Sequence, residues 1–315
     1  MRKKAALFLL MVLLLCLPVV GCGSKNAPEP QTENDEENEP PEPEPVVDER
    51  ITVEFVDPVC VSVNNIDAAR PQSGLQNAGI VYEFLVEGGI TRLLAVFNKP
   101  AGENFIVGPV RSLRPYFAET AMEYGGVVAY SGMSERTARM IRHLPLKGII
   151  SEKYYWRDRS RVAPHNLYTD IEKLYEARGE SGVRREVLEP LELPAGEEVT
   201  EFEVVYNGGN IVRYCYDAEK NAYLRYQNGA AHTDRETGEQ YTATRVIVRK
   251  NRHTPVDNYL VDIDLDGSGT AVLYEGGRKY DLTWEKQDGK TVYCFADGKE
   301  VDLRVGNTWI QVVPL

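Results

Sequence analysis

The chain has 315 residues and a formal net charge of −12 at pH 7, because 48 acidic residues outnumber 36 basic ones. An excess of negative charge repels the phosphate backbone of nucleic acids, so the composition argues against a nucleic-acid partner. The length is sufficient for one large domain or two ordinary ones after a targeting segment.

Residues 1–22 have the pattern of a bacterial lipoprotein signal. Arg2, Lys3 and Lys4 precede an apolar run over 5–20, which matches a secretory signal and is too short for an ordinary membrane span. The run closes with Gly21 and Cys22, which resemble a lipobox, the motif in which the cysteine is lipidated after cleavage. We therefore predict a diacylated Cys22 that anchors the protein to the outer, extracytoplasmic face of the cell membrane.

Residues 23–50 have the composition of a disordered acidic tether. They contain ten acidic and two basic residues, with prolines at 40, 41, 43 and 45. No apolar face is present here to offset the entropy lost on ordering. Charge repulsion and the prolines should keep this segment extended, and most of the net charge of the chain belongs to it.

The segment 51–195 predicts a mixed α/β domain. Strand-like runs lie at 60–65, 80–86, 90–97 and 127–130, and Glu87-Gly88-Gly89 looks like a tight hairpin between the second and third. One helix is expected at 116–124, and Ser134 should cap another at 135–144. Thr169 and Glu172 form a capping box for a helix that ends at Gly179. Helices that alternate with buried strands indicate a mixed sheet covered by helices.

The pattern changes near residue 196, and the rest of the chain predicts a smaller, antiparallel β-rich domain at 196–315. Short runs rich in Val, Ile and Tyr are joined by turns such as Asn228-Gly229 and Asp288-Gly289, which is typical of an antiparallel sheet or barrel. The fold class predicted for the whole chain is therefore α+β.

Two arginines stand at the start of the first predicted helix. Ser112 is a candidate N-cap and Pro115 suits a first helical turn, which places Arg111 and Arg114 at the positive end of the helix dipole. Positive charge there should be offset by an anion. That anion is either a ligand or a nearby carboxylate.

Further polar residues complete a candidate anion-binding site. Glu83, Glu87 and Arg92 are expected at one end of a sheet, and a segment rich in arginine and aromatic residues precedes the third helix. The candidate ligand-binding residues are Arg70, Glu83, Glu87, Arg92, Arg111, Ser112, Arg114, Arg157, Arg161, His165 and Asn166. Mutual salt bridges among these residues are the alternative interpretation.

The remaining motifs argue against metal or cofactor chemistry. The four histidines lack metal-ligand spacing, and no Walker loop or dinucleotide fingerprint is present. Residues 262–267 match the first half of a calcium loop, but Leu273 stands where a glutamate is needed, so a strand is favoured. We expect buried thiols at Cys60, Cys215 and Cys294, with a Cys215–Cys294 bridge as the alternative.

Several segments together resemble a known family. They are 70–75 (RPQSGL), 81–83 (VYE), 87–92 (EGGITR), 108–112 (GPVRS), 114–117 (RPYF), 156–158 (WRD) and 163–168 (APHNLY), with 223–229 (YLRYQNG) and 308–310 (TWI) in the second part. In this order they resemble the YerB-like lipoproteins of Gram-positive bacteria. The resemblance implies an envelope lipoprotein with a two-part extracytoplasmic region. It implies no catalytic residues, because the family has no assigned reaction.

We therefore expect a lipid-anchored extracytoplasmic binding or accessory protein of the cell envelope. Its ligand would carry a carboxylate or phosphate, or its partner would be a membrane-bound protein. One alternative is a cell-wall-directed hydrolase with Glu83, Glu87 or His165 as the general base. Another is a protein-protein adaptor that offers a sheet edge of the β-rich domain to a partner strand.

Overall fold

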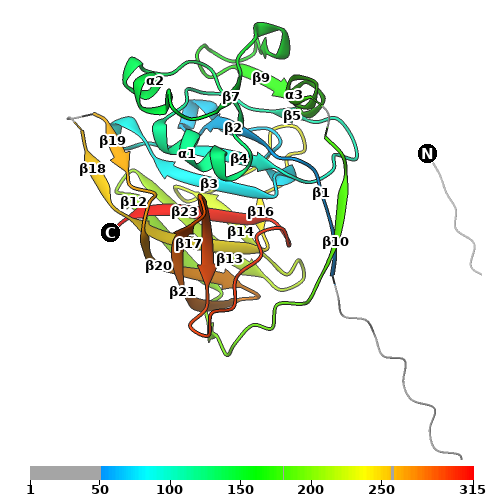
Figure 1. Ribbon diagram of the computed structural model, residues 1–315, viewed down its shortest axis with the longest axis vertical. Coiled ribbons are helices and arrows are strands. Elements are labelled where there is room, and N and C mark those ends of the chain that lie inside the picture. The colour runs from blue at the N-terminus through cyan, green and yellow to red at the C-terminus, as the bar shows by residue number, and fades with distance from the viewer. Residues whose placement is uncertain (1–50, 180, 257–258) are drawn as a thin grey trace, which may run out of the picture. The chain divides into compact units, whose positions relative to one another are not determined.

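An 11-stranded sheet runs through both predicted parts of the chain in the computed structural model (Figure 1), which describes residues 51–179, 181–256 and 259–315. The predicted signal, Cys22 and the tether lie outside these described residues. The strand order is β11-β21-β20-β17-β23-β3-β4-β2-β6-β7, with β22 paired to β21. The strands are β2 (Val59–Asn64), β3 (Ile80–Leu85), β4 (Thr91–Phe97), β6 (Val127–Ala129), β7 (Lys147–Ile149), β11 (Glu197–Glu198), β17 (Arg245–Asn251), β20 (Ser268–Glu275), β21 (Arg278–Gln287), β22 (Lys290–Cys294) and β23 (Thr308–Pro314).

Four smaller sheets accompany this large sheet. A five-stranded sheet holds β12 (Glu201–Asn207), β13 (Asn210–Asp217), β14 (Ala222–Gln227), β15 (Ala230–Ala231) and β16 (Thr242–Ala243). Two-stranded ribbons pair β1 (Ile51–Phe55) with β10 (Arg184–Leu188), and β18 (His253–Pro255) with β19 (Val261–Ile263). A three-stranded sheet contains β5 (Ile106–Val107), β9 (Leu167–Asp170) and β8 (Trp156–Arg157).

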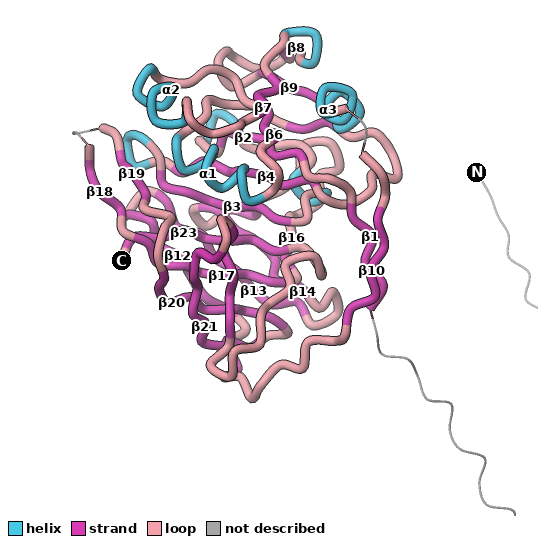
Figure 2. The backbone as a smooth tube through the Cα atoms, viewed as in Figure 1, coloured by secondary structure: helices cyan, strands magenta, loops and turns pink. Residues whose placement is uncertain are grey.

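The α-helices of the described residues all lie before residue 179. They are α1 (Pro115–Glu123), α2 (Glu135–Ile141) and α3 (Ile171–Arg178), and single 3-10 turns lie at Asp67–Ala69, Leu75–Asn77, Glu87–Gly89 and Glu152–Tyr154. Contacts place α1 against β6 and α3 against β2 and β7. Figure 2 shows the helices gathered near β2, β4, β6 and β7.

The helix caps only partly follow the sequence prediction. Ser134 caps α2 by accepting a hydrogen bond from the backbone N–H of Thr137 at 3.0 Å, as predicted. The Ser112 cap is wrong: Arg114 takes the N-cap position of α1, because the residue before a proline avoids helical backbone angles. The Thr169 and Glu172 capping box is also wrong, since Thr169 belongs to β9 and Asp170 caps α3.

Hydrophobic side chains fill both faces of the central strands. Even-numbered residues of β3, such as Tyr82 and Phe84, pack with α1 in one core. Odd-numbered residues, such as Val81 of β3 and Trp309 of the neighbouring β23, pack with α3 and the five-stranded sheet in the other core. Residues two apart on a strand share a face, so this alternation decides on which side of the sheet each polar side chain lies.

The two predicted parts share the large sheet. β23, near the end of the chain, pairs in parallel with β3, and β17 pairs in parallel with β23. The expectation of purely antiparallel pairing in the second part is therefore wrong for β17 and β23. Described residues from 51 onward belong to one compact unit, since the second part completes the sheet begun by the first.

Three further findings concern the other motifs. Cys60, Cys215 and Cys294 are all free; Cys60 is buried as expected, whereas the other two are partly exposed. Asp262 of the calcium-like segment lies on β19, where it pairs with Arg136. Among the described residues, no helix is both long and apolar enough to cross a membrane.

Candidate functional site

The start of α1 carries a compact group of charges, here called the helix-start cluster: Glu87, Arg92 and Arg114. Glu87 follows β3, Arg92 lies on β4, and Arg114 is the N-cap of α1. Arg92 Nη2 donates to Glu87 Oε1 at 2.8 Å, and Arg114 Nε donates to Glu87 Oε2 at 2.8 Å. The carboxylate of Glu87 is therefore shared between two guanidinium groups.

Burial and charge shift the pKa values within this cluster. Burial acts to raise the pKa of Glu87, but the hydrogen bond from Arg114 and the charges of both arginines outweigh it and lower the pKa to about 2. Burial and repulsion by Arg114 lower the pKa of Arg92 to about 10, against the attraction of Glu87. Arg92 is only 2% exposed, and its Nε is a buried donor without a partner among the described atoms.

Ser112 connects this cluster to the segment that carries Arg111. The backbone carbonyl of Ser112 accepts hydrogen bonds from Arg92 Nη1 at 2.9 Å and from Ser62 Oγ at 3.2 Å. The backbone N–H of Arg111 donates to the carbonyl of Ser62 at 2.8 Å. Arg111 is thus held at the end of β2, next to the helix-start cluster.

Arg111 and His165 form the outer part of the site. Asn64 Nδ2 lies 2.8 Å from His165 Nδ1, and an amide nitrogen only donates, so Nδ1 accepts and Nε2 carries the proton. Burial and the charge of Arg111 lower the pKa of His165 below its ordinary value. The ring is therefore neutral at pH 7, and its Nε2–H, which has no hydrogen-bond partner among the described residues, can donate to a ligand.

The arginine charges in this region exceed the carboxylate charges. Arg111 is partly exposed, and among the residues with described placement no carboxylate pairs with its side chain. Arg92 and Arg114 share the single carboxylate of Glu87, and Arg111 adds a third guanidinium to the same segment. A formal excess of two positive charges lies where α1 begins, at the positive end of its dipole.

The other predicted arginines have separate contacts. Arg157 Nη1 donates to Asn166 Oδ1 at 2.9 Å, and Asn166 Nδ2 donates to the carbonyl of Asp158 at 3.0 Å. Arg161 donates to the carbonyls of Ala69 and Pro71 at 2.7 and 2.8 Å. Arg70 pairs with Asp67. Arg70 and Arg161 thus support loops, while Arg157 is exposed and has no carboxylate partner among the described residues.

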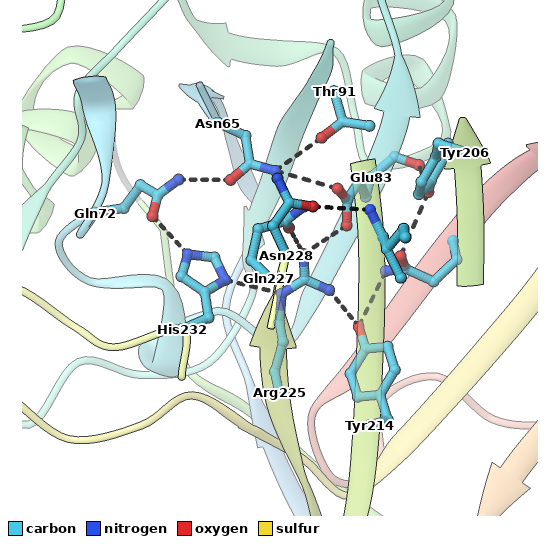
Figure 3. Close-up of polar contacts among 12 residues, drawn as sticks. Asn65, Gln72, Glu83, Thr91, Tyr206, Tyr214, Arg225, Gln227, Asn228 and His232 are labelled. Carbon is cyan, nitrogen blue, oxygen red and sulfur yellow. Dashed lines mark hydrogen bonds and ion pairs between the residues drawn. The ribbon is translucent and has the colours of Figure 1, made fainter. Parts of the chain in front are cut away.

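Glu83 does not join this site. Strand alternation places Glu83 on the face opposite Arg92, since Arg92 is paired across the sheet with Phe84. There it contacts Arg225 of β14, whose Nη2 donates to Glu83 Oε2 at 2.7 Å (Figure 3). Both side chains are 0% exposed. The predicted grouping of Glu83 with Glu87 and Arg92 is therefore corrected.

Several polar side chains contact the buried Glu83–Arg225 pair (Figure 3), and the ring of Trp309 lies over the Arg225 guanidinium, 4.4 Å from its Cζ. Asn65 Nδ2 donates to Glu83 Oε1 at 3.1 Å, and Arg225 Nη1 donates to the hydroxyl of Tyr214 at 2.7 Å. Arg225 Nε donates to His232 Nδ1 at 2.9 Å, and His232 Nε2 lies 2.6 Å from Gln72 Oε1. His232 is therefore neutral, and burial together with the charge of Arg225 lowers its pKa well below the ordinary value.

Arg225 and His232 were not among the site residues predicted from the sequence. A signal for Arg225 exists, because alternation places Tyr223, Arg225 and Gln227 on one face of a strand, and a charge on a buried face needs a partner. The partner was not predictable, because Glu83 lies 142 residues away in sequence.

A second concave region is less suited to a charged ligand. A cleft of about 900 Å³ lies beside the β1–β10 ribbon. Its charged lining is largely paired internally, with Arg184 bound to Asp57 and Arg304 bound to Asp302 and Glu186. In contrast to Arg111, these arginines already have carboxylate partners.

The geometry defines a strand-rich protein with one large sheet and an arginine-rich edge at the start of α1. Family models match residues 47–184 to the N-terminal domain, and residues 202–310 to the C-terminal domain, of the DUF3048 proteins of unknown function. The chain therefore belongs to the DUF3048 family, which confirms the predicted resemblance to YerB-like proteins.

Two comparisons with individual proteins agree with this assignment. A protein of Bacillus subtilis (strain 168) named "Putative lipoprotein YerB" is 34% identical over 272 residues, which cover 82% of this chain and 81% of that protein. The crystal structure of the YerB protein from Bacillus subtilis matches with a TM-score of 0.71 and 31% identity, over 82% of this chain and 91% of that one.

Proposed function

We propose that this protein is a membrane-anchored lipoprotein whose folded part binds an anionic ligand at the edge formed by Arg111, the helix-start cluster and His165. The anchor rests on the charged and apolar signal pattern that closes at Cys22 and on the lipoprotein name of the relative. Substitution Cys22→Ser should release the protein from the membrane fraction and abolish incorporation of a fatty-acid label. A Cys22→Ser variant that stays in the membrane fraction and still incorporates the fatty-acid label would contradict lipid anchoring.

One observation carries the ligand site: where α1 begins, Arg92 and Arg114 share one carboxylate, and the nearby Arg111 has no carboxylate partner among the described residues. Arginine forks suit carboxylates and phosphates, which accept two parallel hydrogen bonds. The Nε2–H of His165, for which the described part of the chain provides no acceptor, adds a neutral donor near Arg111. A ligand with a carboxylate or phosphate would complete the charge balance that the described protein residues leave open.

The test is titration calorimetry with inorganic phosphate and citrate. Arg111→Gln should weaken binding at least about tenfold, since one charge-assisted hydrogen bond contributes roughly 1.5–3 kcal/mol. Arg159→Gln is the matched control, because Arg159 is an exposed arginine on the loop between Arg157 and His165. Equal affinities for the wild type and both variants, or no binding by the wild type, would refute the site.

Single substitution of Arg111 is preferable to joint removal of Arg111 and Arg114. Arg114 donates to both carboxylate oxygens of Glu87, so its loss disturbs the fold as well as the site. Arg111 makes its described protein hydrogen bonds through its backbone. The single variant therefore separates ligand binding from folding.

The geometry favours binding over general-base catalysis. His165 Nδ1 already accepts from Asn64, which leaves Nε2 protonated. A carboxylate with a pKa of about 2, such as Glu87, is a weak base. Glu83 is fully buried against Arg225.

A further inference from the structure

We propose that the ligand is a saccharide that carries the anionic group, with its sugar ring in an aromatic pocket beside Arg111. This inference rests on the proposed anion site and specifies the class of its ligand. The aromatic pocket has a volume of about 420 Å³, which lies within the range of small-molecule sites. Its lining side chains include Tyr130, Ile150, Glu152, Tyr155, Trp156 and Arg157.

Backbone hydrogen bonds place this pocket next to the anion site. Ser131 and Gly132 line the pocket. The backbone N–H of Ser131 donates to the carbonyl of Arg111 at 3.1 Å, and the carbonyl of Gly132 accepts from the N–H of Leu113 at 3.0 Å. Ser112 Oγ is only 3.9 Å from the position of a Cβ on Gly132. The segment that carries Arg111 is therefore a direct neighbour of the pocket wall.

The fold also explains why the pocket lies here. β2, β6 and β7 run in parallel, and Tyr130 and Ile150 directly follow the carboxyl ends of β6 and β7. Ligands of open sheets bind in crevices outside the carboxyl ends of parallel strands. The segment with Trp156 and Arg157 then closes one side of this crevice.

The lining chemistry fits a sugar ring better than a purely apolar ligand. A sugar presents C–H groups on its faces and hydroxyl groups along its edge, so it needs apolar surface next to polar groups. Aromatic side chains supply rigid apolar surface with few rotatable bonds, and Ile150 is 60% exposed although it borders the pocket. Arg157 and Glu152 supply a donor and an acceptor at the rim.

Charge decides which kind of sugar fits. Arg157 makes one described hydrogen bond, to Asn166, and the carboxylate of Glu152 on the same rim matches its charge, so the excess positive charge is the one at Arg111. A neutral sugar would leave this positive charge uncompensated. A sugar phosphate or sugar acid would place its ring against the aromatic side chains and its anion towards Arg111.

The experiment compares four probes on the intact folded protein: glucose 6-phosphate, glucuronate, glucose and inorganic phosphate. Trp156 is partly exposed, whereas Trp284 and Trp309 are buried, so quenching of tryptophan fluorescence should report occupancy of the pocket. We expect glucose 6-phosphate to bind at least tenfold more tightly than inorganic phosphate and to change the fluorescence. Glucose alone should bind much more weakly.

Variants separate this inference from the proposed function. Trp156→Ala and Arg157→Gln should each reduce the affinity for glucose 6-phosphate at least fivefold and leave phosphate binding intact, while Arg159→Gln changes neither. Equal binding of phosphate and glucose 6-phosphate would overturn the saccharide inference and leave the anion site standing. Absence of binding by every anion would refute both. Because Trp156 also packs on Tyr168, Arg157→Gln provides the test if Trp156→Ala fails to fold.

Discussion

Two arginine-containing regions of this molecule differ in how their charge is balanced. Arg225 is fully buried, and its guanidinium is bound by Glu83, Tyr214, His232 and Gln227. Arg111 is partly exposed, and among the described residues it has no carboxylate partner. The same side chain therefore stabilises the fold in one place and remains available to a ligand in the other.

This difference shows that burial and local charge balance, more than residue type, assign a role to an arginine. A buried guanidinium must be paired and hydrogen-bonded, because an isolated buried charge is very costly. A guanidinium at the surface keeps its water and can exchange it for an anion. The helix-start cluster is intermediate, since Glu87 and Arg114 remain 11% and 15% exposed.

The largest effect is expected in the buried network. Arg225→Met leaves the carboxylate of Glu83 buried without its cation, which should destabilise the protein by about 3–5 kcal/mol. Urea unfolding followed by circular dichroism measures this change, with exposed Arg159→Met as the control. The double variant Arg225→Met with Glu83→Gln should recover part of the stability that Arg225→Met loses. A loss below about 1 kcal/mol for Arg225→Met would show that the pair is not essential for stability.

A smaller, pH-dependent effect is expected at Glu87. Its pKa in the folded protein is about 2, below the ordinary value of about 4.3 in an unfolded chain. The contribution of Glu87 is therefore complete above about pH 4.5 and is lost as the pH falls towards 2. After allowance for solvent screening of this partly exposed pair, we expect about 2 kcal/mol.

To isolate this contribution, the free energy of unfolding of the wild type and of Glu87→Gln is measured at pH 6 and at pH 3. The difference in stability between the two proteins should shrink at pH 3. Glu135→Gln is the control, because Glu135 is exposed and its partner Arg139 lies one helical turn away. A difference that is the same at both pH values would contradict the role assigned to the Glu87 carboxylate.

The smallest change in stability belongs to Arg111→Gln, the variant used to test anion binding. We expect less than about 0.5 kcal/mol, as for most surface substitutions. A loss comparable to that of Arg225→Met would assign Arg111 to a structural network and remove the contrast between the two regions.

Local patterns in the sequence predicted much of the first part of the fold. Alternation located β3 and β4, the Ser134 cap located the start of α2, and Pro115 located the start of α1. Caps failed where neighbouring residues competed, as at Thr169 and Asp170. These signals act over a few residues, so sequence alone can reveal them.

Such local patterns could not predict which distant segments of the chain pair with one another. The sequence contains no local signal that β23 inserts beside β3, or that Arg225 meets Glu83. Period-two alternation tells which face a side chain occupies and leaves open which strand lies above it. The sequence therefore predicted separate sheets for the two parts, although both contribute strands to the 11-stranded sheet.

The lipoprotein-like start, the acidic composition of residues 23–50 and the arginines where α1 begins could all be predicted from the amino-acid sequence. Which of the arginines are neutralised became evident only in the folded molecule, because charge balance depends on carboxylates that folding brings close. Folding pairs Arg225 with Glu83, pairs Arg92 and Arg114 with Glu87, and leaves Arg111 beside a neutral His165.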